Sequence, residues 1–166
     1  MFPQYLAYMD SPLGRILLRA TNEGLTAAHF VAENEAAHAE ATPEHPILQA
    51  TKAQLQAYFA GERKTFDVPL APAGSDFQKR VWQELLNIPW GSTTSYLNLA
   101  EKLGSKLTIR AVGGANGKNP IAIILPCHRV IGSDGSLTGY AGGLWRKQWL
   151  LALEGWPKES QLQIPF

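Results

Sequence analysis

A segment rich in proline and glycine, residues 67–74, interrupts the chain and limits what it can fold into. Proline lacks a backbone N–H and has a fixed φ angle, so Pro69 and Pro72 do not suit the interior of a helix or a central strand. Short runs of aromatic and branched residues precede the segment, whereas apolar residues at helical spacing follow it. We therefore expect an α+β protein with two domains. Residues 1–72 should form an N-terminal α/β domain with a small antiparallel sheet, and residues 73–166 a mostly helical C-terminal domain.

The N-terminal half predicts three strands followed by a helix. Turn residues separate three segments that suit an antiparallel meander. These segments are residues 5–9, 14–20 and 25–30. Apolar side chains then repeat at helical spacing over residues 47–59, and Gly61 follows as a stop. The acidic, alanine-rich residues 33–44 are compatible with a loop or a weak helix.

The C-terminal half predicts helices joined by short turns. Ser75 or Asp76 can cap the first helix, and Thr94 or Ser95 the second. The four expected helices are residues 77–89, 96–103, 108–116 and 144–154. Because a short turn containing Gly104 separates the second from the third, these two fit the helix-turn-helix pattern, which many other packed helix pairs also show.

Residues 132–136 form a tight loop, which predicts a small hairpin between residues 130–131 and 137–138. In the last helix, we expect Arg146 and Lys147 on a polar side. The residues expected to face inward are Trp149, Leu150 and Leu153.

The third expected helix is nearly bare of side chains. It contains Ala111, Gly113, Gly114 and Ala115, and a glycine costs a helix about 1 kcal/mol relative to alanine. Such a helix makes sense where something must approach its backbone closely. A nucleic-acid groove and tight packing beneath a neighbouring loop are both compatible with it.

The only cysteine lies in the segment Leu125-Pro126-Cys127-His128-Arg129-Val130. Pro126 holds the cysteine at a defined turn, His128 supplies a base with an ordinary pKa of about 6.5, and Arg129 adds positive charge nearby. The thiolate is the nucleophilic form of cysteine, and a neighbouring base or cation increases its fraction. A lone cysteine is also commonly a small buried apolar residue. The segment therefore predicts either a reactive thiol or a packed one.

Composition and charge limit the classes of protein to which the chain can belong. One cysteine allows neither an internal disulfide nor a structural zinc cluster, which favours a reduced cytoplasm. No apolar run approaches the ~20 residues of a membrane span, and the N-terminus lacks the pattern of a secretory signal. Residues 76–166 carry ten Lys/Arg and six Asp/Glu, a net charge of +4, whereas residues 1–75 carry five and eight, a net charge of −3. This asymmetry suits a one-sided contact with a polyanion, although an ordinary solvated surface can also show it.

Five motifs occur in an order that points to a family. They are residues 110–116 (RAVGGAN), 119–120 (NP), 126–132 (PCHRVIG), 138–143 (TGYAGG) and 149–155 (WLLALEG). With these motifs the chain resembles the O6-alkylguanine-DNA alkyltransferases, also called methylated-DNA–protein-cysteine methyltransferases. The resemblance is strong over residues 75–156 and loose over the first 70 residues.

The resemblance implies direct-reversal DNA repair. A flipped O6-alkylguanine, and also O4-alkylthymine, would lose its alkyl group to Cys127 in an irreversible, stoichiometric reaction that uses no metal and no organic cofactor. The implied partner is double-stranded DNA with an alkylated guanine, bound through the minor groove. We expect a cytoplasmic monomer that can cluster on DNA and that has no membrane contact.

The resemblance also implies roles for individual residues. The catalytic set is Cys127, His128, Glu154, Tyr96 and Asn119. The DNA-binding set is Arg110, Ala111, Gly113, Gly114, Ala115, Asn116 and Thr94. The substrate-pocket set is Tyr96, Ala122, Val130, Tyr140 and Ala141. In this scheme His128 is the base, reached through a water molecule and oriented by Glu154, and Arg110 enters the duplex where a base has left.

Four residues depart from the usual pattern of the family, all at the helix pair expected to face DNA. They are Leu97, Lys106, Thr108 and Ile109. Affinity for DNA or substrate range can therefore differ from the family norm. Ala122 is small, which leaves room for larger alkyl groups.

Two other interpretations stay open from the sequence alone. One is a module that binds damaged DNA without transfer, against which the presence of Cys127 argues. The other is a hydrolase with a Cys-His-Glu triad, which steady turnover of an activated ester would reveal.

Overall fold

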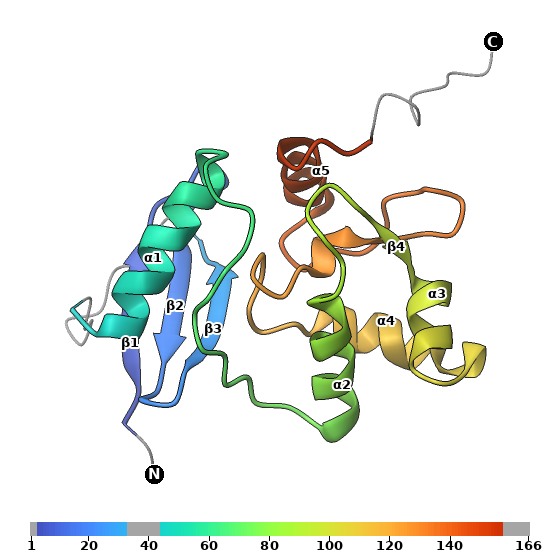
Figure 1. Ribbon diagram of the computed structural model, residues 1–166, viewed down its shortest axis with the longest axis horizontal. Coiled ribbons are helices and arrows are strands. Elements are labelled where there is room, and N and C mark those ends of the chain that lie inside the picture. Colours follow the sequence, from blue (N-terminus) through green and yellow to red (C-terminus); the bar gives the residue numbers. More distant parts are fainter. Residues whose placement is uncertain (1–2, 33–43, 158–166) are drawn as a thin grey trace. The chain divides into compact units, whose positions relative to one another are not determined.

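The computed structural model describes residues 3–32 and 44–157 (Figure 1). Backbone packing divides the chain into two units. The first unit comprises residues 1–74 and 120–124, and the second comprises residues 75–119 and 125–166. The segment expected as a loop or weak helix, apart from Glu44, lies outside the described residues. The expected α+β class is confirmed.

The first unit is built on a three-stranded antiparallel sheet in the order β1-β2-β3. The strands are β1 (Tyr5–Met9), β2 (Ile16–Ala20) and β3 (Leu25–Phe30). Helix α1 (Pro46–Phe59) packs on this sheet (Figure 1) and contacts all three strands. Its buried residues follow helical spacing, which is why one face of the helix turns toward the sheet. They are Leu48, Thr51, Leu55 and Tyr58.

Part of the expected linker belongs to the first unit. Leu25 donates its N–H to the carbonyl of Pro69 at 2.8 Å and accepts from the N–H of Ala71 at 2.8 Å. Gly24 makes this approach possible, because a Cβ atom at that position would lie 2.8 Å from the carbonyl oxygen of Pro69. The segment therefore runs beside the start of β3 before the chain enters the second unit.

A later segment, residues 120–124, returns to the edge of β3. Ala28 donates to the carbonyl of Pro120, and Ala122 donates to the carbonyl of Ala28, each at 2.8 Å. The next residue, Ile123, has a φ angle of 74°, which is strained for a β-branched side chain. A hydrogen bond of 2.8 Å from Ile124 N to Ala122 O closes a very tight turn around it.

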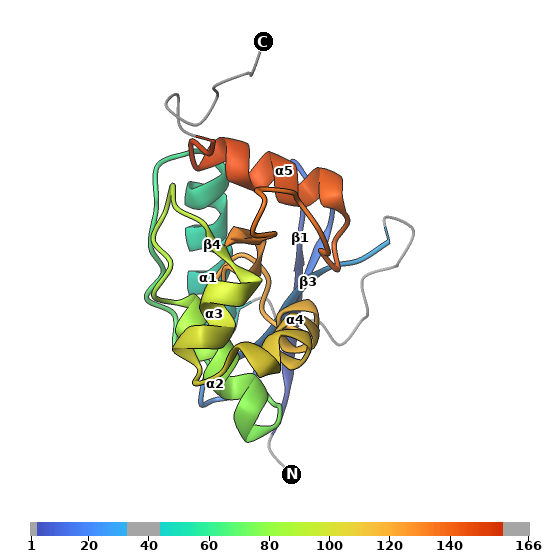
Figure 2. The ribbon, with the colours of Figure 1, turned by 90° about the vertical axis from the view of Figure 1, so that its right-hand side faces the viewer.

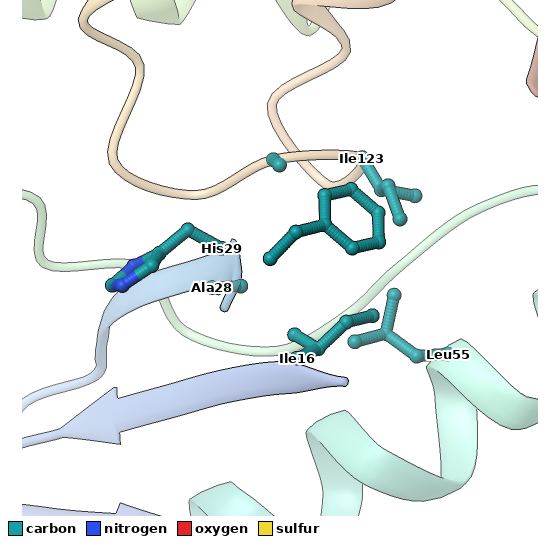
Figure 3. A pocket seen from close by; sticks show the side chains of 7 residues that line it. Ile16, Ala28, His29, Leu55 and Ile123 are labelled. Atoms are coloured by element: carbon teal, nitrogen blue, oxygen red, sulfur yellow. The ribbon is translucent and has the colours of Figure 1, made fainter. Parts of the chain in front are cut away.

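The side chain of Ile123 lines a small apolar pocket in the first unit (Figure 3). The other lining residues are Ile16, Ala28, His29, Phe30, Leu55 and Ala122. Only 2% of Ile123 is exposed. Burial of this side chain thus accompanies the strained backbone four residues before Cys127.

The second unit consists of short helices around the cysteine segment. Its elements are α2 (Asp76–Leu85), β4 (Thr94–Ser95), α3 (Tyr96–Lys102), η1 (Lys106–Thr108), α4 (Ile109–Gly117), η2 (Cys127–Arg129), β5 (Val130–Ile131) and α5 (Leu144–Leu153). Helices α3 and α4 contact each other (Figure 2), as the helix-turn-helix pattern predicts. The indole N–H of Trp82 donates to the carbonyl of Ala115 at 2.9 Å and ties α2 to α4.

Serine side chains cap the N-termini of α2, α3 and η1. Ser75 and Gln78 form a reciprocal capping box at the start of α2. Ser95 accepts from the N–H of Asn98 and caps α3. Ser105 does the same for η1 by accepting from Leu107, so a single turn of 3-10 helix precedes α4.

The hairpin expected between residues 130–131 and 137–138 is wrong. Strand β5 instead pairs in parallel with β4, with Thr94 opposite Val130. The intervening loop still closes, because Gly132 donates to the carbonyl of Ser136 at 2.9 Å. The carbonyls of Val130 and Thr138, which a hairpin ladder would use, accept hydrogen bonds from the ammonium group of Lys147.

None of the helices in the two described ranges combines the length and the apolarity needed to cross a membrane.

Replacing Ser75 with alanine should lower the free energy of unfolding by about 1 kcal/mol, because the first turn of α2 loses the acceptor for a backbone N–H. Urea denaturation followed by circular dichroism measures the change. Ser75→Asp is the matched control, since an aspartate can also cap the helix, and it should retain the wild-type stability. Equal losses in both variants would show that the cap is not the cause.

Candidate active site

The 3-10 turn η2 places three consecutive functional side chains in the interior of the second unit. Cys127 is 6% exposed, His128 is fully buried and Arg129 is 6% exposed. Pro126 precedes them with φ −81° and ψ 63°, and Cys127 donates its N–H to the carbonyl of Leu125 at 2.7 Å. Pro126 is thus the central residue of a tight turn, and η2 begins directly after it at Cys127.

A buried carboxylate at the end of α5 connects this turn to the rest of the unit. Glu154 Oε2 accepts from His128 Nε2 at 2.8 Å. The guanidinium of Arg129 grips the same carboxylate with two hydrogen bonds, Nε to Oε1 at 2.7 Å and Nη2 to Oε2 at 2.9 Å. Arg129 Nη1 also donates to the carbonyl of Ile88 at 2.6 Å. The positive charge of Arg129 is therefore directed at Glu154.

Burial and the neighbouring charges shift the pKa values of both Glu154 and His128. Burial alone would raise the pKa of Glu154, but the hydrogen bonds and charges of His128 and Arg129 outweigh it and lower the pKa to about 2. Burial lowers the pKa of His128 in spite of Glu154. The imidazole is therefore neutral, with its proton on Nε2 facing the carboxylate. Its Nδ1 atom has no hydrogen-bond partner among the described residues and is free to accept a proton.

The thiol of Cys127 is held in its protonated form by its surroundings. Burial raises its pKa, and this effect exceeds the opposing effects of the Asn119 side chain and of the Lys147 charge. Asn119 also donates from Nδ2 to the carbonyl of Leu125 at 2.6 Å, which links the end of the α4 segment to the backbone just before the cysteine.

Lys147 is buried, and the expectation that it lies on a polar side of the last helix is wrong. Its ammonium group donates to the carbonyls of Val130 at 2.6 Å, Thr138 at 2.8 Å and Gly139 at 3.3 Å. Burial lowers its pKa to about 8, and the nearby Cys127 acts in the opposite direction. The sequence contained a signal for this, because residue 147 shares a helix face with the buried Leu150, Leu151 and Glu154.

Two tyrosines of the expected substrate pocket lie in the same unit. The hydroxyl of Tyr96 donates to the carbonyl of Thr138 at 3.0 Å, and burial raises its pKa. The Lys147 ammonium lies 5.8 Å from the centre of the Tyr96 ring. The hydroxyl of Tyr140 is buried without a hydrogen-bond partner among the described residues, so a donor or acceptor from a ligand could satisfy it.

The remaining residues of the expected substrate pocket are Val130, Ala141 and Ala122, and they differ in burial and in the unit to which they belong. The side chain of Val130 is buried, and its carbonyl accepts from Lys147. Ala141 is exposed. Ala122 belongs to the first unit, where it pairs with β3 and lines the apolar pocket. The other members of the catalytic and pocket sets belong to the second unit.

The residues expected to contact DNA divide between two sides of α4. Arg110, Ala111 and Gly114 are exposed and Gly113 is partly exposed. Ala115 and Asn116 are buried, so their side chains are not part of the exposed face. Asn116 Nδ2 donates to the carbonyl of Cys127 at 3.3 Å.

The glycines of α4 have no steric justification within the described residues. A Cβ atom at position 113 would come no nearer than 4.0 Å to the ring of Tyr96, which is ordinary contact. At position 114 a Cβ atom would meet nothing within 4 Å. Thr94, the remaining residue of the expected DNA-binding set, is partly exposed and forms the β4–β5 pair.

The described residues offer no cluster of side chains suited to bind a metal ion. Among residues 3–32 and 44–157, no three His, Cys, Asp or Glu side chains gather in a way that could hold one. The polar side chains around Cys127 bond to each other and to backbone carbonyls, apart from His128 Nδ1 and the hydroxyl of Tyr140.

Known proteins match the chain over nearly its whole length. The family model described as "6-O-methylguanine DNA methyltransferase, DNA binding domain" matches residues 76–156. The model described as "6-O-methylguanine DNA methyltransferase, ribonuclease-like domain" matches residues 4–72. The N-terminal half, whose resemblance was loose in its motifs, thus also matches the family.

Individual relatives are similar to the chain over most of their length. A methylated-DNA–protein-cysteine methyltransferase of Methanosarcina acetivorans is 50% identical over 154 residues, which cover 91% of this chain and 98% of that protein. One from Mycobacterium tuberculosis is 49% identical over 147 residues, covering 88% of this chain and 89% of that protein. The crystal structure of Mycobacterium tuberculosis OGT in complex with DNA matches with a TM-score of 0.81 at 48% identity, covering 90% of this chain and 92% of that chain.

These matches confirm the family, the enzyme class and the binding of DNA that the motifs implied. The chain therefore belongs to the 6-O-methylguanine DNA methyltransferase family, as a DNA-binding methylated-DNA–protein-cysteine methyltransferase that repairs O6-alkylguanine.

Proposed function

We propose that Cys127 is the acceptor of the alkyl group and that His128 and Glu154 activate it. The observation that carries the proposal is the hydrogen bond of 2.8 Å between His128 Nε2 and Glu154 Oε2, in the same turn as the only cysteine of the chain. It leaves His128 Nδ1 as an unpartnered buried acceptor. A nucleophile, a base and a group that orients the base are the three parts that this chemistry needs.

The transfer begins with removal of the thiol proton. Because burial keeps Cys127 protonated, the proton must leave as the substrate reacts, and a bridging water would carry it to His128 Nδ1. The Sγ–carbon bond then forms while the bond between the alkyl carbon and O6 breaks. The electron pair passes to O6, and the purine takes up a proton that balances the one lost by the thiol.

Donors near O6 would stabilise the leaving purine. The Tyr96 hydroxyl and the backbone amide of Ala141 are the candidates, and Tyr96 at present donates to the carbonyl of Thr138. Lys147 supports this arrangement, since it holds the carbonyls of Thr138 and Gly139 and places a positive charge close to Cys127. Tyr140, with its unpartnered hydroxyl, and Val130 complete the pocket.

The product explains why each molecule would act once. A thioether has no good leaving group, and no second cysteine exists in the chain to resolve it. The same chemistry applies to O4-alkylthymine, which presents an alkyl group on a similar carbonyl oxygen.

The duplex would be bound by the exposed face of α4 in the minor groove, with the target base flipped out. The small residues Ala111, Gly113 and Gly114 allow close approach of the backbone, and the exposed Arg110 supplies a planar cation that can stack in the opened helix. Thr94 lies at the partly exposed β4 strand. Ala115 and Asn116 would support this face from within. We further propose a monomer that can cluster on DNA.

Incubation of the folded protein with free O6-benzylguanine should add one benzyl group to Cys127, as intact mass and peptide mapping would show. Cys127→Ser should gain none, because serine lacks a thiolate and has no comparable nucleophile at neutral pH. Circular dichroism provides the control that the variant is folded. An unmodified wild-type protein under these conditions would refute the proposal.

The pH dependence of stability should reveal Glu154. Its folded-state pKa of about 2 lies below the ordinary 4.5, so its stabilisation is complete above about pH 5 and is lost as pH falls from 4.5 toward 2, where the unfolded state binds the proton first. Glu154→Gln should be less stable than the wild type by about 3 kcal/mol at pH 6. The difference should shrink on acidification.

Urea denaturation at a series of pH values between 6 and 3 measures this difference. A gap between wild type and Glu154→Gln that stays constant over the series would show that the Glu154 carboxylate does not titrate as the structure requires.

Lys147→Met should slow transfer from O6-benzylguanine and lower the free energy of unfolding by about 1–3 kcal/mol, because buried carbonyls lose their donor. The rate comes from the time course of adduct formation by mass spectrometry. Lys118→Met, at an exposed lysine, is the matched control and should change neither quantity. Wild-type kinetics in Lys147→Met would exclude a role for this ammonium in the site.

A further inference from the structure

An exposed leucine lies directly beside the proposed DNA-binding face. Leu107, in η1, is 94% exposed. Single exposed apolar residues are common on protein surfaces and need no explanation by themselves. The position of this one relative to Arg110 is what makes it informative.

Leu107 extends the exposed row of α4 by one turn. Residues three or four positions apart lie on one side of a helix, so Leu107 shares a side with Arg110, Ala111 and Gly114, all of which are exposed. The opposite side of α4 is buried, at Val112, Ala115 and Asn116. Small side chains follow Arg110 along the row, and a large apolar one precedes it.

The charge around this row suits a polyanion. Lys102, Lys106, Arg110 and Lys118 are exposed, and the nearby Glu101 is 3.6 Å from Lys106 in an ion pair. A protein partner with an apolar socket would have to accept this cationic surround, whereas the minor groove of a duplex offers phosphates on its rims and less polar sugar and base surfaces inside.

We propose that Leu107 enters the minor groove beside Arg110 as an apolar wedge that helps to open the duplex at the lesion. This inference rests on the proposed role of α4 and Arg110. Two positions three residues apart differ by about 5 Å in rise, and bases stack about 3.4 Å apart. Leu107 therefore meets the duplex one to two base steps from Arg110, where an inserted apolar side chain partly unstacks a step.

The test compares one reaction on three substrates. Adduct formation on Cys127 is timed with free O6-benzylguanine, with a single-stranded oligonucleotide that contains O6-benzylguanine, and with the same oligonucleotide in a duplex. Leu107→Ser removes the wedge. Leu107→Lys replaces it with a further cation, and Leu86→Ser alters another exposed leucine (43% exposed) outside the α3–α4 pair.

The wedge predicts that Leu107→Ser reacts about tenfold more slowly with the duplex and at the wild-type rate with the free base and the single strand. Leu107→Lys should also be slow on the duplex despite its added charge, and Leu86→Ser should match the wild type. With 2-aminopurine one or two steps from the lesion, binding of the wild type should raise its fluorescence through unstacking, and binding of Leu107→Ser should raise it less.

Two results would overturn the wedge. One is wild-type duplex kinetics in Leu107→Ser or in Leu107→Lys, which would leave only an electrostatic role for this surface. The other is an equal loss on all three substrates, which would place the effect in the fold. Failure of the wild type to react with the free base would instead count against the proposed role of Cys127, so the two hypotheses fail separately.

Discussion

The rest of the site depends on the hydrogen bonds that the carboxylate of Glu154 accepts. It accepts hydrogen bonds from the imidazole of His128 and from two nitrogens of Arg129, and all three side chains are buried. A buried ion pair gains little net stability once desolvation is counted. Here its consequence is geometric, because one carboxylate sets the orientation and the tautomer of His128 and joins the end of α5 to the turn that carries Cys127.

In the proposed scheme, this arrangement keeps Cys127 unreactive until a substrate arrives. Glu154 is ionised, His128 is neutral and the thiol of Cys127 is protonated, since burial dominates the pKa of both His128 and Cys127. A permanently exposed thiolate would be open to oxidation, and the burial of Cys127 limits that exposure. Reactivity in this site therefore requires substrate, proton acceptor and leaving-group donors to be in place together.

Local features of the fold were predictable from the sequence, whereas contacts across long separations were not. Capping serines and glycine stops follow from short-range hydrogen bonding, and they located the starts of α2 and α3. The pairing of Thr94 with Val130 and the contact between His128 and Glu154 join distant residues. Periodicity carries no information about such contacts, and for the second of them only the family resemblance supplied it.

Lys147 and Arg129 illustrate the same limit for charged residues. Both types are rarely buried unless paired, so a sequence places them on the surface by default. The burial of Lys147 depends on three carbonyls, one on strand β5 and two in the segment that leads to α5. The burial of Arg129 depends on Glu154 and on the carbonyl of Ile88. Neither set of acceptors can be recognised before the chain is folded.

Tight packing within the protein explains one side of the bare helix α4 and leaves the other side to the proposed contact with DNA. Tight packing accounts for Ala115 and Asn116, which lie under the cysteine turn and are bound by Trp82 and by the Cys127 carbonyl. It does not account for Gly113 and Gly114, where a methyl group would meet only ordinary contact or none. Two glycines cost the helix roughly 2 kcal/mol relative to alanine, with no return from the described part of the fold. Nothing in the described part of the fold accounts for bare backbone on that side, whereas the proposed contact with a DNA groove would account for it.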